Sequence, residues 1–131
     1  MTIANTPFLR NVLLIDGAAG LAMGGAVAGM APLLAPFLDL PQALLFWAGL
    51  ALVPVGLFLL ALSRRQTVSR LVLIDIVALN SLWAAASFGL MLTGTITPNA
   101  LGVAFVAGQA LFVGALAACQ LQSLRTAASA A

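Results

Sequence analysis

The chain has 131 residues, of which 63% are hydrophobic and 6% charged, and its formal net charge is +2. Ordinary soluble domains carry about 25% charged residues, so this composition excludes a soluble globular domain and indicates an integral membrane protein. Five basic and three acidic residues give a sequence pI near 10.1. We interpret the excess of basic residues as a signal that orients the protein in the membrane and not as a nucleic-acid-binding surface.

Four predicted spans account for the chain, because a membrane-crossing helix needs about 20 apolar residues. We therefore expect a single transmembrane domain over residues 1–131. The first span covers about 12–30 and follows Thr6-Pro7, a capping hydroxyl and a proline suited to the first helical position. Residues 31–41 carry three prolines and predict a short interfacial segment, and the second span covers about 43–62.

The third span covers about 71–92 and the fourth about 101–121. Thr67 is the expected cap of the third helix, and Thr97-Pro98 are expected to start the fourth in the manner of Thr6-Pro7. The predicted fold class is an all-α integral membrane protein, a four-helix transmembrane bundle.

The distribution of charged residues indicates on which side of the membrane each span ends. With four spans, the N-terminus, the middle loop and the C-terminus share one side, which then holds every basic side chain, namely Arg10, Arg64, Arg65, Arg70 and Arg125. By the positive-inside rule we expect a multi-pass membrane protein with both termini in the cytoplasm. A cleavable signal peptide ending near Ala26-Val27-Ala28 is the competing interpretation, which Asp16 within the apolar region disfavours.

The phrase Leu-Ile-Asp occurs twice, ending at Asp16 and at Asp75, each time after an arginine. The two copies lie 59 residues apart, a distance that contains two predicted membrane crossings. Both copies would thus enter from the same side. This predicts two tandem helical hairpins related by a parallel pseudo-two-fold axis along the membrane normal, unlike the inverted repeats of many carriers.

The two aspartates need partners. Counted from Asn11 and Arg70, each lies about 7 to 8 Å into its helix, where a carboxylate must find a partner or water. Neighbouring arginines on the same helix do not share its face, so the partner is expected from another helix. Candidates at that depth are Arg64, Arg65, Gln120, Gln122 and Arg125, which together with Asp16, Asp75 and Arg70 make up the predicted polar site.

Three interpretations of this site stay open: an interhelical lock, which we favour; a paired acidic site for a proton, a cation or a cationic ligand; and a contact to a partner protein or a lipid headgroup. Asn80 and Gln109 fall near the middles of their spans and are expected to form an interhelical hydrogen bond. Gly17, Gly20, Gly24 and Ala28 form a stripe of small residues that predicts close helix packing, within the bundle or in a homo-oligomer.

No enzyme and no cofactor are expected. The chain has no histidine and one cysteine, Cys119, so the commonest general base and metal ligand is missing and no internal disulfide framework can form. No phosphate-binding loop or nucleophile elbow is present.

The stretches FLRNVLLID, DLPQALLFWAGLALVP and TPNALGVAFVAGQALFVGALAACQLQSLR resemble a group of small, uncharacterised bacterial inner-membrane proteins with four spans. This resemblance covers nearly the whole chain and implies a bacterial inner membrane, without any site. Small multidrug-resistance exporters have a similar length and helix count, but they depend on a glutamate in the first helix, and this chain contains none.

The expected function is therefore a non-enzymatic structural or accessory module of the bacterial inner membrane, in the lipid bilayer as a homo-oligomer or within a larger membrane-protein complex. The alternative is a small oligomeric carrier, or a cation- or proton-binding membrane protein, that uses Asp16 and Asp75.

Overall fold

Four long helices make up most of the protein. A computed structural model describes the backbone of residues 1–130 and the side chains of residues 1–127. The long helices are α1 (Pro7–Gly29), α3 (Gln42–Ser63), α4 (Arg70–Leu92) and α5 (Ala100–Ala130). Each contains a stretch long and apolar enough to cross a membrane. The predicted all-α four-helix transmembrane bundle is confirmed, and the protein is a multi-pass membrane protein.

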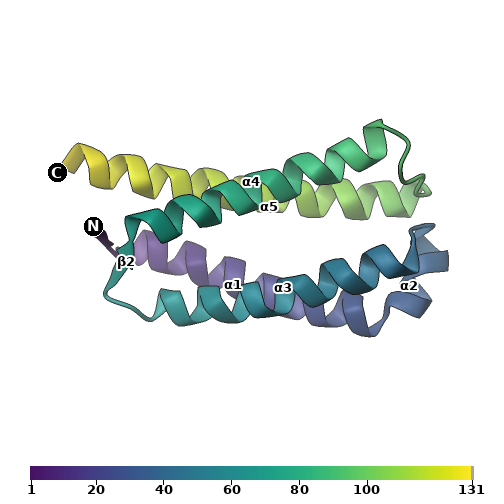
Figure 1. The fold of residues 1–131 in the computed structure, drawn as a ribbon, viewed down its shortest axis with the longest axis horizontal. Coiled ribbons are helices and arrows are strands. Elements are labelled where there is room, and N and C mark those ends of the chain that lie inside the picture. The colour runs from purple at the N-terminus through teal and green to yellow at the C-terminus, as the bar shows by residue number, and fades with distance from the viewer. Residues whose placement is uncertain (131) are drawn as a thin grey trace.

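The long helices pack as two hairpins, α1 against α3 and α4 against α5 (Figure 1). The short helix α2 (Ala31–Leu38) confirms the predicted short segment and lies at the end of the bundle opposite the N-terminus. The two hairpins are held together mainly by contacts of α5 with α1 and α2, whereas α3 and α4 make little direct contact. Two hairpins agree with the expectation, but a repeat relationship between them stays a prediction.

Glycines allow α1 and α3 to approach closely. A Cβ built on Gly24 would lie 2.6 Å from the carbonyl oxygen of Gly49, and one built on Gly56 would lie 2.8 Å from the carbonyl oxygen of Gly17. Separations below 3.0 Å are essentially never found for real Cβ atoms, so side chains at these positions would push the helices apart. The predicted stripe therefore serves packing between α1 and α3.

Two of the long helices, α1 and α5, start with a side-chain cap, one of them as predicted. The Thr6 hydroxyl accepts a hydrogen bond from the Leu9 N–H at 3.2 Å, and Pro7 is the first helical residue. The predicted start of the fourth helix is wrong, because the Asn99 side-chain oxygen accepts from the Gly102 N–H at 2.9 Å and α5 begins at Ala100. Asn99 also donates to the Phe37 carbonyl at 2.9 Å, which ties this cap to α2.

A short antiparallel ribbon is an element that the sequence analysis does not predict. Strand β1 (Thr2–Ala4) pairs with β2 (Thr67–Ser69), with Ile3 opposite Val68. The expected role of Thr67 as a helix cap is wrong, because its backbone belongs to the ribbon and α4 begins at Arg70. The side-chain amide of Asn5 donates to the carbonyls of Ser63 and Arg65 at 3.2 and 2.8 Å. The N-terminus thus satisfies carbonyls left free where α3 ends.

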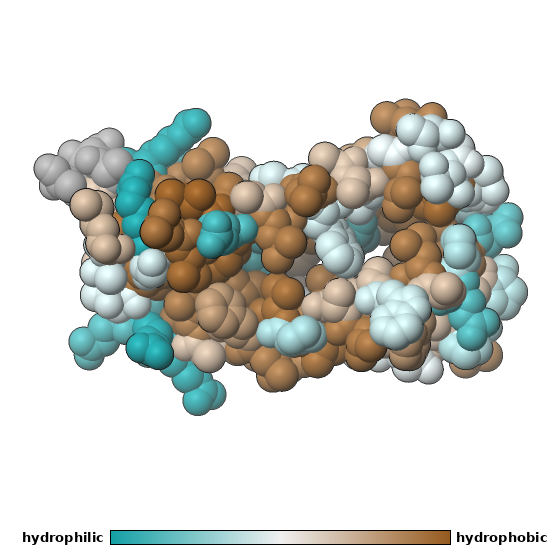
Figure 2. Space-filling model, viewed as in Figure 1, coloured by the Kyte–Doolittle hydropathy of each residue, from teal (hydrophilic) through white to brown (hydrophobic). Residues whose placement is uncertain are grey.

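Two buried apolar clusters lie toward the two ends of the bundle. The inner cluster, at the end with the N-terminus, consists of Leu9, Leu13, Leu59, Val68, Leu73, Ile76 and Leu124. The outer cluster, at the end with α2, consists of Val27, Ala31, Leu38, Leu40, Leu45, Ile96 and Val106. On the face shown in Figure 2, most of the surface between the two ends is hydrophobic as well, as expected of helices in contact with lipid.

Candidate functional site

Three polar side chains from three helices meet inside the bundle. Asp16 of α1 accepts hydrogen bonds at Oδ2 from the amide of Asn80 on α4 at 2.9 Å and from the amide of Gln120 on α5 at 2.7 Å. The Asn80 amide also donates to the Gln120 side-chain oxygen at 2.9 Å. Their exposed fractions are 7%, 8% and 0%. We call this set the Asp16 triad; it joins the two hairpins.

The triad uses one of the two carboxylate oxygens. Both hydrogen bonds that Asp16 accepts from the described residues end on Oδ2. Among the described side chains, Asn5 Oδ1 is the polar atom that is fully buried and has no hydrogen-bond partner. Asp16 Oδ1 also has no partner within residues 1–127 but does not meet this description, so it is not fully buried within the protein. Asp16 lines a cavity, and its second oxygen is therefore available to a bound molecule.

Asp16 lies farther along its helix than the sequence analysis predicts. Helix α1 begins at Pro7, so Asp16 is nine residues from its start, or about 14 Å at 1.5 Å per residue. The expected distance, counted from Asn11, is about half as large. Asp16 is therefore well inside a helix that can span a membrane, and an ionised side chain within such a span is costly to place and marks a functional site by default.

The cavity lies between the two hairpins and is mostly apolar. Its inner section has a volume of about 450 Å³ and is lined by Asp16, Asn80 and residues of all four long helices. Its outer section, about 220 Å³, shares Trp83 and Gln109 with the inner one and extends toward α2. The surface in Figure 2 is hollowed between the hairpins. We call the two sections together the inter-hairpin cavity.

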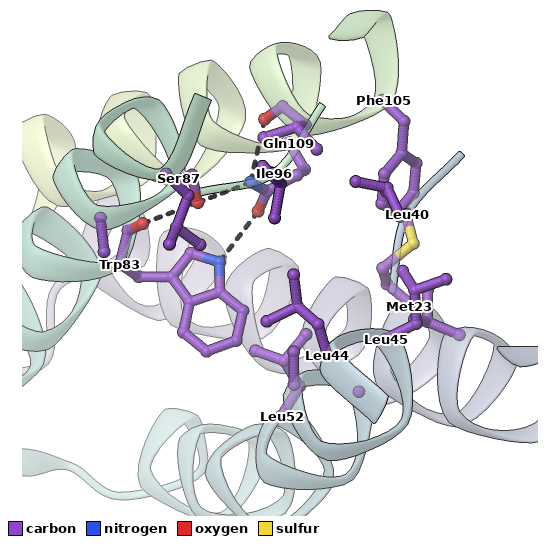
Figure 3. Close-up of a pocket in the computed structure, with 16 residues that line it drawn as sticks. Met23, Leu40, Leu44, Leu45, Leu52, Trp83, Ser87, Ile96, Phe105 and Gln109 are labelled. Atoms are coloured by element: carbon purple, nitrogen blue, oxygen red, sulfur yellow. Dashed lines mark hydrogen bonds between the residues drawn. The ribbon is translucent and has the colours of Figure 1, made fainter. Parts of the chain in front are cut away.

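A second polar group lies where the two sections meet. The Gln109 side chain accepts from the Trp83 indole N–H at 2.9 Å and donates to the Ser87 hydroxyl at 2.9 Å. Figure 3 shows the indole ring of Trp83 beside the cavity, with its N–H directed at Gln109. Asn80, Trp83 and Ser87 recur at helical spacing on one face of α4, which is the sequence signal that could have indicated this arrangement.

The predicted hydrogen bond between Asn80 and Gln109 is wrong. Each residue bonds to other partners, Asn80 within the Asp16 triad and Gln109 with Trp83 and Ser87. Along the bundle, Gln109 of α5 therefore lies beside Trp83 and Ser87 of α4. These two residues are about one to two helical turns beyond Asn80. Matching the midpoints of the predicted spans misplaces the two helices, because α5 continues to Ala130 and does not end near residue 121.

Pairing of Asp16 with an arginine is also wrong. Its hydrogen-bond donors within the described residues are amides, including Gln120, one of the predicted partners. Arg64 and Arg65 lie at or beyond the end of α3 and are exposed, and Arg10 donates to the Arg65 carbonyl at 3.4 Å. The remaining predicted site residues do not reach the triad. Gln122 and Arg125, two and five residues beyond Gln120 on α5, are exposed, and Arg70 lies at the start of α4, ten residues before Asn80.

The second aspartate occupies a different environment. Asp75 is exposed, whereas Asp16 is buried. It precedes Asn80 by five residues on α4, so it lies about 7 to 8 Å closer to the inner end than the triad. The expectation that the two Leu-Ile-Asp phrases place their carboxylates in equivalent positions is wrong, because one phrase faces the other hairpin and the other faces outward.

The described residues contain no group of three or more histidine, cysteine or acidic side chains that could hold a metal ion. No family model, curated protein or solved structure matches the chain. Its function must therefore be argued from the cavity and the polar groups that line it.

Proposed function

We propose that this is a non-enzymatic cation-binding membrane protein of the carrier type, which holds a small amphipathic cation in the inter-hairpin cavity. The observation that carries the proposal is the placement of Asp16. This side chain is 7% exposed, lines an apolar cavity and has one carboxylate oxygen that accepts no hydrogen bond from residues 1–127. Asp16 is the anionic anchor in this proposal.

Charge balance favours a cationic ligand. The amides of Asn80 and Gln120 direct N–H groups at Asp16 Oδ2, but they carry no net charge. A positive partner stabilises an ionised carboxylate in a low-dielectric interior, whereas an unpaired one costs several kcal/mol or more. A cation bound at Oδ1 would supply that charge, and the Trp83 ring on the same cavity offers a further cation–π contact.

The shape of the cavity favours an elongated ligand with one polar end. Ligand pockets usually measure about 300 to 1,000 Å³ and are largely apolar with few polar groups. The inner section, about 450 Å³, contains the carboxylate, and the outer section adds an apolar continuation toward Leu40 and Ile96. An alkylammonium ion fits this arrangement, with its ammonium group at Asp16 and its chain along the outer section.

The proposed location is the bacterial inner membrane with both termini in the cytoplasm. The N-terminus and the far end of α5 lie at the same end of the bundle (Figure 1), and hydrophilic side chains gather there (Figure 2). The positive-inside rule supports a cytoplasmic assignment for this arginine-bearing end. The resemblance to small four-span inner-membrane proteins supports the same location, and a homo-oligomer or larger complex stays a prediction.

The second candidate is the structural or accessory module expected from the sequence. The Asp16 triad favours it too, because its hydrogen bonds join α1 of one hairpin to α4 and α5 of the other. In that case the triad is a lock between hairpins, and the cavity is filled by lipid chains without selectivity for charge.

Thermal unfolding in phosphatidylcholine nanodiscs, with decylammonium or its neutral match 1-decanol, separates the two candidates. A ligand at 100 times its Kd stabilises the folded state by about 2.7 kcal/mol. Decylammonium should raise the unfolding temperature of the wild type and of the control variant Asp39→Asn. Asp39 has a left-handed backbone conformation with φ 56°, which asparagine also adopts readily. Decylammonium should not stabilise Asp16→Asn, which keeps the shape of the side chain but removes its charge.

Equal stabilisation of Asp16→Asn and wild type by decylammonium, or none in the wild type, would refute ligand binding through Asp16. The structural candidate makes a separate prediction for Asp16→Leu. This change leaves the amides of Asn80 and Gln120 without their acceptor and should destabilise the fold by about 2 to 4 kcal/mol, whatever ligand is present.

A further inference from the structure

A groove runs between α3 and α4 on the outside of the bundle. It has a volume of about 380 Å³ and is lined by Pro54 and Phe58 of α3 and by Val72 and Asp75 of α4. Asn80 and Leu79 line both this groove and the inner section of the inter-hairpin cavity. The groove and the cavity are therefore adjacent across a shared wall.

Both ends of the bundle are closed by apolar side chains. The inner cluster contains Leu9, Leu13 and Leu73, each 0% exposed, and the outer cluster contains Ala31 at 1%. A molecule that moved along the bundle axis from water would have to cross one of these packed clusters. Because α3 and α4 make little direct contact, the side of the bundle between them offers less resistance.

Asp75 marks the outer side of this groove. It is exposed and follows the start of α4 by five residues, about 7 to 8 Å along the helix, so it lies within the span. None of the hydrogen bonds within the described part of the chain involves its carboxylate. A carboxylate on the lipid-facing surface of a span is costly, and such residues mark ligand or ion pathways.

We propose that the α3–α4 groove is a lateral portal, through which the amphipathic cation enters the cavity from the bilayer, and that Asp75 recruits the cation at its mouth. This inference rests on the proposed function and adds where the ligand comes from. The ligand enters from the membrane and not from the water at either end of the bundle. Charge complementarity supports it: an amphipathic cation in the cytoplasmic leaflet meets Asp75 first and Asp16 last, with Asn80 between them.

Stopped-flow fluorescence can test this inference. In a Trp47→Phe background Trp83 is the remaining tryptophan of the chain, and it lines the cavity. The protein is reconstituted in phosphatidylcholine vesicles and mixed with vesicles that contain decylammonium or 1-decanol. Asp75→Asn should slow the association of decylammonium by about threefold to tenfold, because an attractive charge near an entrance raises association rates, and should leave 1-decanol unchanged.

A second variant tests the route independently of charge. Val72 lines the groove but not the cavity, and Val72→Trp should slow both ligands by narrowing the portal. Asp39→Asn serves as the charge control at the other end of the bundle and should change neither rate.

The outcomes separate the two proposals. Unchanged association rates in Asp75→Asn and Val72→Trp, with binding intact, would overturn lateral entry and leave the proposed function standing. Absence of any decylammonium-dependent Trp83 signal in the Trp47→Phe protein without further changes would overturn the proposed function itself.

Discussion

Replacement of Gly24 by alanine should weaken the α1–α3 hairpin. The added Cβ would lie 2.6 Å from the Gly49 carbonyl oxygen, about 0.8 Å less than the 3.4 Å at which ordinary contact begins. A backbone oxygen cannot rotate away, so the two helices must separate along their seam. Overpacking of this kind costs about 1 to 3 kcal/mol, and the better helix propensity of alanine offsets about 1 kcal/mol of it.

The matched control is Gly25→Ala on the same helix. A Cβ added at Gly25 would meet no neighbouring helix within 4 Å, so this change should keep the propensity gain and stabilise the protein by up to about 1 kcal/mol. We therefore expect Gly24→Ala to be less stable than Gly25→Ala by about 1 to 3 kcal/mol. Reversible unfolding with sodium dodecyl sulfate in mixed micelles measures this difference. Equal stability of the two variants would refute the close seam between α1 and α3.

Three further predictions concern other parts of the bundle. In a Cys119→Ala background, Gln66→Cys, in the loop before β2, should react with an impermeant maleimide only after cell lysis. Thr95→Cys in the same background should react in intact cells; the reverse pattern would contradict the proposed orientation. Asn5→Ala should lower the unfolding free energy by about 1 to 2 kcal/mol, because its amide donates to carbonyls at the end of α3; an unchanged value would show that water replaces it. Gln109→Leu should lower it by about 1 to 3 kcal/mol, because the Trp83 indole N–H loses its acceptor; thermal unfolding measures this loss, and an unchanged midpoint would contradict it.

The spans could be predicted from the sequence because they depend on local properties. Apolar length and the Thr6-Pro7 cap determine where a helix can run, and both act within a few residues. The start of α5 is not predicted correctly because Thr97 and Asn99 are both suitable caps, and the β ribbon is not predicted because it pairs residues far apart in sequence. Neither depends on hydropathy.

The candidate site could be predicted only in part. Asp16 and Gln120 can both be predicted, since a carboxylate deep in apolar sequence needs a polar partner and Gln120 lies near the same end. The arginine pairing and the Asn80–Gln109 bond are wrong because the bounds of the expected spans do not give the relative depth of two helices, and errors of one helical turn change which side chains meet. The exposure of Asp75 depends on helix rotation, which an almost uniformly apolar helix does not reveal.

The central claim, that Asp16 binds a cation from within the cavity, can be tested most directly by carbon-13 NMR of the aspartate carboxyl carbons. The chain contains three acidic residues, Asp16, Asp39 and Asp75, so selective labelling gives three carboxyl signals that single asparagine variants assign. In nanodiscs titrated with decylammonium, the Asp16 signal should move saturably, the Asp39 signal should stay in place, and 1-decanol should not reproduce the change. An Asp16 signal that stays in place, or that follows 1-decanol equally, would contradict the account.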